Sequence, residues 1–124
     1  MRLLLDTHAL LWWLAGDGLG IQARDAIADP ANLVFVSAAS AWEISVKKDL
    51  GKLTAPDDLE QQVHSGGFLP LPVSIAHGVA AGQLARHHDD PFDRMLIAQA
   101  QAESLTIVTR DKRFHEYGVA LLTA

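Results

Sequence analysis

The sequence predicts an α/β fold in which helical layers surround a mainly parallel sheet. Short apolar segments recur along the 124 residues and alternate with longer segments of helical pattern. The composition, 49% hydrophobic and 20% charged, is typical of a globular protein. At this length folding buries roughly two-thirds of the surface of the unfolded chain, so we expect one compact domain over residues 1–124.

Five apolar or β-branched segments have the length of strands. The leucines at 3–5 form a continuous apolar run that ends at Asp6. The run LVFV is β-branched and aromatic, which favours a buried strand. The prolines of FLPLPV restrict that segment to an edge of the sheet. In chain order, the expected strands are residues 3–5, 33–36, 68–73, 106–109 and 119–122.

Helical segments lie between these strands, and several have recognisable ends. Asp29-Pro30 stops the second helix, and Ser37 and Ser74 can cap the third and the fifth. Pro56 opens the fourth helix, which ends at Gly66-Gly67. In chain order, the expected helices are residues 9–14, 21–28, 38–50, 56–65, 75–84 and 92–103, with a short helical turn at 111–117.

Composition excludes several function classes. The chain contains no cysteine, which excludes disulfides, a thiol nucleophile and cysteine-based metal sites. Its formal net charge is −5, and a bare polyanion such as nucleic acid is not attracted to that net charge. A nucleic-acid partner therefore requires that the acidic excess be local and covered by a cation.

The apolar N-terminal segment resembles a secretory signal only superficially. Asp6 and His8 interrupt it, and the longest apolar run there covers residues 9–15. That run is too short to span a membrane and makes a poor signal sequence. We therefore expect a cytoplasmic protein whose first strand begins near its N-terminus.

Four acidic residues are predicted to converge at one edge of the sheet. Asp6 follows the first strand, and Asp111 follows the strand 106–109. Glu43 lies in the helix after the second strand, and Asp93 lies in the first turn of the helix before Thr106. Ligands of open parallel sheets bind outside the carboxyl ends of the strands, where these four side chains are expected.

Each acid also has a purely structural interpretation. Asp6 and Asp111 can be helix N-caps, and Asp90, before a proline, can cap the helix that contains Asp93. Glu43 can form a capping box with Ser40 or an ion pair with Lys47.

Burial favours a metal site over these structural interpretations. On a helix, Asp93 shares its face with Leu96, Ile97 and Ala100, and Glu43 likewise has apolar neighbours. Burying unpaired carboxylates costs several kcal/mol unless a cation is present. The four acids and Asp90 carry five negative charges, which equals the whole net charge of the chain. Ligation by oxygen alone selects a hard ion, Mg²⁺ or Mn²⁺.

Four segments carry a family resemblance: LLLDTHALLWWL (3–14), VSAASAWEISVKKDLGKL (36–53), HHDDPFDRMLIAQA (87–100) and TIVTRD (106–111). They resemble the PIN-domain family, and within it the VapC-type toxin ribonucleases of type II toxin–antitoxin systems. The resemblance implies a three-layer α/β/α fold with a central, mainly parallel sheet of about five strands. It also implies a Mg²⁺- or Mn²⁺-dependent endoribonuclease that forms a homodimer and binds a cognate antitoxin.

The carboxylate set of the family maps onto Asp6, Glu43, Asp93 and Asp111, with Asp90 as an additional acid of the DPFDR motif. We interpret Asp6 and Asp93 as the principal ligands of one or two ions. Glu43 and Asp111 would hold a second ion or orient the attacking water, and Asp90 would support them. Three further side chains are candidates to bind the substrate: Thr7 and Thr109, whose hydroxyls can contact a phosphate or a metal-bound water, and Arg94.

The tryptophans and histidines have less specific interpretations. Trp12 and Trp13 point about 100° apart on a helix, so one of them is expected at an interface. Trp42 is interpreted as a core residue. The tract HHDD at 87–90 is interpreted as a solvated loop, because consecutive residues seldom ligate one ion well.

Alternatives from other classes remain open at this point. One is a PIN-like binding module without catalytic activity, although its acidic set is intact. Another is a Mg²⁺-binding receiver-type signalling domain. Against the receiver, Asp6 is followed by Thr7, Ser37 follows the second strand in place of an aspartate, and no lysine comes after Lys112. A third keeps the nuclease site but applies it to structured DNA or to ribosomal RNA processing.

Overall fold

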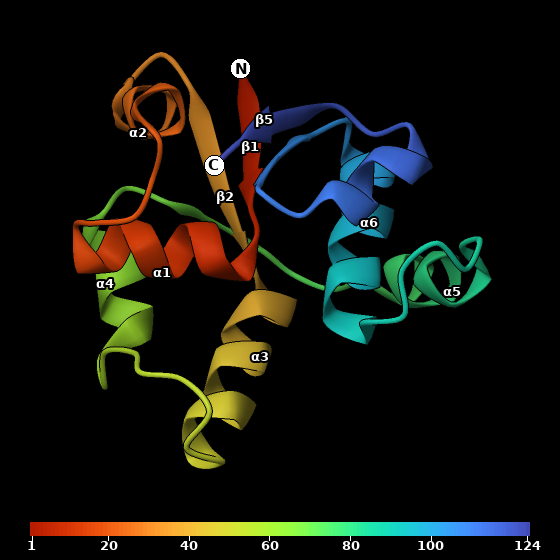
Figure 1. The fold of residues 1–124 in the computed structure, drawn as a ribbon, viewed down its shortest axis with the longest axis horizontal. Helices are drawn as coiled ribbons and strands as arrows, with labels where there is room; N and C mark the ends of the chain where they lie inside the picture. Colours follow the sequence, from red (N-terminus) through yellow and green to blue (C-terminus); the bar gives the residue numbers. More distant parts are fainter.

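The computed structural model describes all 124 residues as helices layered on a five-stranded parallel sheet (Figure 1). The strand order is β3-β2-β1-β4-β5, and all neighbouring strands are parallel. The strands are β1 (Arg2–Leu5), β2 (Leu33–Ser37), β3 (Leu69–Leu71), β4 (Thr106–Thr109) and β5 (Leu121–Thr123). This architecture confirms the predicted fold class.

The central strand is β1, which explains its continuous apolar sequence. Leu4 pairs with Phe35 of β2 on one side and with Ile107 of β4 on the other. Leu3, Leu4 and Leu5 are completely buried, because helices cover both faces of a parallel sheet.

Helices lie on both sides of the sheet, with α1, α2 and α4 on one side and α5 and α6 on the other (Figure 1). Helix α3 continues from β2 at the carboxyl end of the sheet and contacts both α1 and α6. The helical elements are α1 (Thr7–Ala15), α2 (Ile21–Ala28), α3 (Ala38–Asp49), α4 (Leu59–Ser65), α5 (Ile75–Gln83), α6 (Pro91–Glu103) and a 3₁₀ helix, η1 (Lys112–Tyr117).

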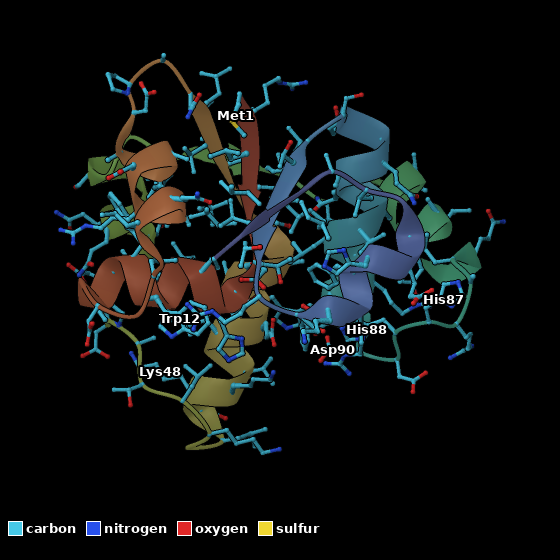
Figure 2. All side chains as sticks on the ribbon, turned by 45° about the horizontal axis from the view of Figure 1, so that its top comes forward. Met1, Trp12, Lys48, His87, His88 and Asp90 are labelled. Carbon is cyan, nitrogen blue, oxygen red and sulfur yellow. The ribbon has the colours of Figure 1, made fainter.

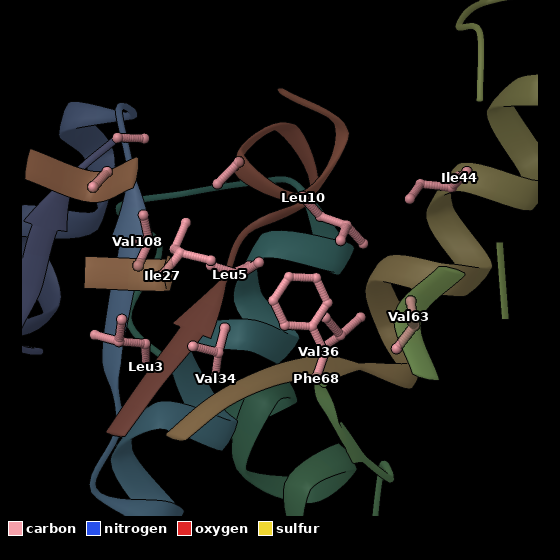
Figure 3. Close-up of a cluster of buried hydrophobic side chains, with 13 residues drawn as sticks. Leu3, Leu5, Leu10, Ile27, Val34, Val36, Ile44, Val63, Phe68 and Val108 are labelled. Atoms are coloured by element: carbon pink, nitrogen blue, oxygen red, sulfur yellow. The ribbon is translucent and has the colours of Figure 1, made fainter. Parts of the chain in front are cut away.

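The two-residue period of β1 divides the core into two clusters. Leu3 and Leu5 face the side of α1 and α2, where they join the cluster that also contains Phe68 (Figure 3). Leu4 faces α6 and packs in the second cluster with Ile97. The sheet is thus fixed by apolar packing on both faces, and its carboxyl edge holds the ends of β1, β2 and β4.

Most element boundaries differ from the predicted ones by one or two residues, and the largest difference is at the start of α4. Helix α4 begins at Leu59 rather than at Pro56, because a turn at residues 57–58 precedes it. Strand β5 begins at Leu121, two residues later than predicted. No helix combines the length and apolar character needed to cross a membrane.

The prediction that Trp42 is a core residue is wrong. Its side chain is 65% exposed on α3 and packs edge-to-face against Phe92, with 5.2 Å between the ring centroids. Trp12 and Trp13 are instead both half-buried. Trp13 contacts Phe68, and the Arg110 guanidinium lies 4.0 Å from the ring centroid of Trp12. Their orientations on α1 differ as expected, but both rings find partners within the chain.

Candidate active site

The ends of β1 and β4 place two carboxylates at the carboxyl edge of the sheet. Asp6 directly follows β1, and its carboxylate accepts a hydrogen bond from the Ala9 N–H at 2.8 Å, which caps α1. Its own N–H donates to the Val108 carbonyl, so the parallel pairing continues to the first residue of the site. Asp111 follows β4 and caps η1 by accepting from the Arg113 N–H. Both residues are therefore helix caps as well as members of the site.

Helix α3 brings Glu43 to the same edge. Ser37, the last residue of β2, accepts from the Ala39 N–H and starts this helix, so the capping-box interpretation of Ser40 and Glu43 is wrong. Glu43 is buried, and its carboxylate accepts from the Thr7 hydroxyl at 2.5 Å and pairs with Lys47 one turn later. The Thr7 contact joins α1 to α3 beside Asp6.

The beginning of α6 contributes the remaining two acids. Asp90 is the N-cap, and its carboxylate accepts from the N–H groups of Phe92 and Asp93 at 2.9 and 3.1 Å. Pro91 occupies the first helical position, where the missing N–H costs nothing. Asp93 lies in the first turn, so the α6 N-terminus directs its partial positive charge towards the carboxylates.

The Asp93 carboxylate lies within electrostatic range of the other four acids. Burial raises the pKa of Asp93 to about 8, and repulsion from four carboxylates contributes, namely Asp90, Glu43, Asp6 and Asp111. Burial also raises the pKa of Asp6, against the effect of a hydrogen bond from the Thr109 hydroxyl. We call this group of Asp6, Glu43, Asp90, Asp93 and Asp111 the acidic site.

Two cationic side chains compensate only part of this negative charge. Lys47 pairs with Glu43, and hydrogen bonding to that carboxylate raises the lysine pKa. Arg113 binds Asp111 through both carboxylate oxygens, and this bond lowers the pKa of Asp111. Five acidic side chains face two cations, so the partly buried site keeps an excess of negative charge even when Asp93 is protonated. Such a donor set, made of oxygen atoms only, fits a hard divalent cation.

His88 also belongs to this region, although the sequence interpretation placed it in a solvated loop. His87 and Asp89 are exposed as expected, but His88 is only 1% exposed. Figure 2 shows His88 beside Asp90, whereas His87 lies further out. The His88 Nε2 atom is 2.9 Å from an oxygen of Asp93 and 3.2 Å from an oxygen of Asp111. The available signal was the position of His88 two residues before a helix N-cap, where an imidazole can accept from the cap N–H.

The three residues predicted to contact phosphate have other partners. The Thr7 hydroxyl donates a hydrogen bond to the Glu43 carboxylate, and the Thr109 hydroxyl accepts one from the Asp111 N–H at 3.0 Å. Both threonines are buried and orient acids of the site. Arg94 lies on the buried side of α6, and its guanidinium donates hydrogen bonds to backbone carbonyl oxygens. A direct phosphate contact by Arg94 is therefore not compatible with this structure.

Arg94 instead fixes the segment between α5 and α6. Its two terminal nitrogens donate to four carbonyl oxygens at 2.9 to 3.1 Å, those of Ala81, Leu84, Ala85 and His88. The first of these carbonyls lie in the last turn of α5, where backbone acceptors lack intrahelical partners.

Replacing Arg94 with methionine is expected to lower the free energy of unfolding by about 3 kcal/mol, because four buried or part-buried carbonyl oxygens lose a charged donor. Urea denaturation followed by circular dichroism measures this change. The control is Arg86→Met at an exposed position of the same segment, which should change stability by less than about 0.5 kcal/mol. Equal stability of the two variants would contradict the role assigned to Arg94.

Comparisons with known proteins agree with this fold. Residues 3–120 match the PIN domain. Ribonuclease VapC16 from Mycobacterium tuberculosis is 37% identical over 68 residues, which are 52% of this chain and 48% of that protein. The match therefore spans about half the length of this curated relative.

Solved structures show the same architecture at low sequence identity. VapBC2 from Rickettsia felis, bound to a DNA fragment from its promoter, matches with a TM-score of 0.71 and 15% identity, over 98% of both chains. A toxin–antitoxin complex from Klebsiella pneumoniae matches with a TM-score of 0.66 and 18% identity, over 97% of this chain and 95% of that one. Since the PIN domain covers nearly the whole sequence and the fold agrees throughout, this chain belongs to the PIN-domain family.

Proposed function

We propose that this chain is a Mg²⁺- or Mn²⁺-dependent endoribonuclease, with residues 1–124 forming one nuclease domain, and that it is the toxin of a toxin–antitoxin pair. The observation that carries the proposal is the acidic site, in which five carboxylates face only two cations. Its position at the carboxyl edge of a PIN-domain sheet supports a nuclease, as does the similarity to a protein named a ribonuclease.

The residues of the acidic site have different proposed roles in phosphodiester hydrolysis. Asp6 and Asp93 are proposed as the principal metal ligands, and Glu43 and Asp111 would hold a second ion or orient the attacking water. Asp90 supports them by fixing the first turn of α6. When bound, a divalent ion lowers the pKa of a water ligand and neutralises charge on the phosphorane.

Buried hydroxyl groups keep two of these carboxylates in place. The Thr7 hydroxyl holds one oxygen of Glu43, and the Thr109 hydroxyl bonds Asp6. A site held in this way needs little reorganisation during the reaction, which is how preorganised electrostatics lowers a barrier. The threonines therefore act on the substrate only through the acids.

Digestion of a mixed RNA pool tests the proposal. The purified chain should cleave RNA in Mg²⁺ or Mn²⁺ and should not cleave it in EDTA. Asp6→Asn should remove the activity, while Asp89→Asn, at an exposed residue outside the acidic site, should retain it. Metal-independent cleavage, or full activity of Asp6→Asn, would refute the proposed site. Mn²⁺ binding without cleavage of any RNA or DNA would favour the binding module.

The sheet topology argues against the receiver-type alternative. Receiver domains have the strand order 2-1-3-4-5, in which the first strand lies between the second and the third. Here β1 lies between β2 and β4. Ser37 also stands in place of an aspartate after the second strand. Together, the strand order and this residue exclude a receiver domain.

An antitoxin and a second copy of the chain are the proposed protein partners, and the cytoplasm the proposed location. Similarity to a structure described as a toxin–antitoxin complex supports the antitoxin partner. An exposed apolar surface on α3 and α6 supports association with a second copy. It surrounds a hollow of about 410 Å³ whose lining includes Trp42, Val73, Phe92 and Met95.

Replacing Trp42 with glutamate is expected to weaken self-association at least about tenfold, since a charge would be buried where an aromatic side chain packed. Light scattering during size-exclusion chromatography at several concentrations measures the change. The control is Ile21→Glu, at an exposed residue of α2, which should leave self-association unaltered. If the Trp42→Glu variant dimerises like the wild type, this surface is not the interface.

A further inference from the structure

The position of His88 has a consequence for the acidic site. We infer that His88 is a positioning residue whose imidazole N–H holds the carboxylates of Asp93 and Asp111 together, and that it is not itself a metal ligand. The inference rests on the proposed function, because it concerns the same site. Distances alone would suggest that His88 is a ligand, since atoms of His88, Asp93 and Asp111 all lie within 4.8 Å of one another. The hydrogen bonds of the imidazole indicate otherwise.

The backbone of His88 is fixed from both sides. Its N–H donates to the Tyr117 hydroxyl at 2.8 Å, and its carbonyl accepts from Arg94 at 3.1 Å. The same Tyr117 hydroxyl donates to the Ala85 carbonyl at 2.7 Å. The loop between α5 and α6 is therefore tied to η1 and to α6, and His88 cannot move without breaking these bonds.

The ring of His88 is also held in one orientation. It packs against Phe114 of η1 with 5.6 Å between the ring centroids, and its side chain is completely buried. Its Nδ1 atom faces the Asp90 N–H at 3.1 Å. A backbone N–H can only donate, so Nδ1 accepts and carries no proton.

The proton of the neutral ring must then be on Nε2. This N–H donates to Asp111 at 3.2 Å, and the nitrogen lies 2.9 Å from Asp93. Neither ring nitrogen has a free lone pair, because one is protonated and the other accepts from Asp90. A metal ligand needs such a lone pair, so the imidazole serves as a donor to ligands rather than as a ligand.

The carboxylates held by His88 come from segments distant in the sequence. Asp93 belongs to the first turn of α6, whereas Asp111 follows β4. The His88 N–H between them fixes their separation before a cation binds, and it reduces their mutual repulsion once Asp93 is ionised. Outer residues of this kind typically change metal affinity by about 10- to 100-fold when they are removed.

Two substitutions of His88 test whether its imidazole is a hydrogen-bond donor to the carboxylates or a metal ligand. In His88→Gln the side-chain amide can place an N–H near the position of Nε2, whereas in His88→Asn the shorter amide keeps only an acceptor for the Asp90 N–H. We expect His88→Gln to bind Mn²⁺ within about threefold of wild type, and His88→Asn to bind it about 10- to 100-fold more weakly. If His88 were a ligand, both variants would lose affinity, so equal losses would overturn the inference.

Nitrogen NMR of the histidine rings tests the same point without activity. In metal-free protein, the resonance missing from His88→Gln should show a protonated Nε2 and an unprotonated Nδ1, and saturation with Mg²⁺ should leave this pattern unchanged. A proton on Nδ1, or loss of the Nε2 proton in Mg²⁺, overturns the inference. Failure of the wild type to bind either metal would instead refute the proposed function, while the spectrum of the metal-free protein would still decide the role of His88.

Discussion

Replacing Asp93 with asparagine is expected to abolish metal-dependent RNA cleavage and, without metal, to stabilise the fold. The two effects have one cause. The Asp93 carboxylate lies among four other acids, and burial together with their repulsion raises its pKa to about 8. A bound cation stabilises the ionised carboxylate of Asp93, whereas in the metal-free protein ionisation of Asp93 near pH 8 destabilises the fold.

The Asp93→Asn variant should therefore cleave RNA at least about 100-fold more slowly in Mn²⁺. In EDTA near pH 8 its midpoint of urea denaturation should be higher than that of the wild type. Asp89→Asn removes one charge at an exposed position of the loop before α6 and should change neither quantity. If Asp93→Asn is less stable than the wild type in EDTA, repulsion at Asp93 does not destabilise the metal-free fold, and this prediction is wrong.

The second large effect is a loss of stability of the metal-free protein as the pH rises from about 5 to about 8. In the unfolded chain Asp93 ionises near 3.8, whereas in the folded protein it keeps its proton until about 8. Between these values the folded state binds one more proton than the unfolded state. The free energy of unfolding therefore falls with rising pH, by at most about 1.4 kcal/mol per pH unit for this proton.

The other acids with altered pKa values do not obscure this effect. Burial raises the pKa of Asp6, which adds to the fall in the same direction. The hydrogen bond from Arg113 lowers the pKa of Asp111, so the stabilisation by this pair is lost only on acidification below the ordinary aspartate range. Its titration lies outside the pH interval in question.

Urea denaturation of the wild type and of Asp93→Asn in EDTA, repeated across this pH interval, measures the contribution of Asp93. The difference in unfolding free energy should be small near pH 5 and should grow in favour of the variant towards pH 8. A difference that does not change with pH would contradict the raised pKa of Asp93.

Sequence patterns were sufficient to predict the sheet and the acids at its edge. The continuous leucines of β1, the β-branched residues of β2 and β4, and the strand-terminal position of Asp6 are local signals, and the strand that they predict at 106–109 matches β4 residue for residue. Asp6 and Asp111 meet there because parallel strands end at one edge of the sheet, and the helices α3 and α6 bring Glu43 and Asp93 to the same edge.

The features that were missed depend on contacts between distant segments. His88 is buried because Tyr117 and Phe114, from η1, and Arg94, from α6, surround its backbone and its ring. The local sequence HHDD contains none of these partners. Arg94 has a charged side chain, and only the tertiary structure shows that its guanidinium faces carbonyl oxygens rather than substrate. Trp42 has an apolar side chain, but it lies on α3 with 65% of its surface exposed, and no local signal distinguishes it from a core residue.

Calorimetric titration of Mn²⁺ into the metal-free protein near neutral pH tests most directly whether the acidic site holds a divalent cation. The wild type should bind the ion with saturable heat, Asp6→Asn and Asp93→Asn should each lose most of the affinity, and Asp89→Asn should titrate like the wild type. Saturable binding that is equal in all four proteins would place the ion elsewhere. Absence of binding by the wild type would contradict the metal site itself.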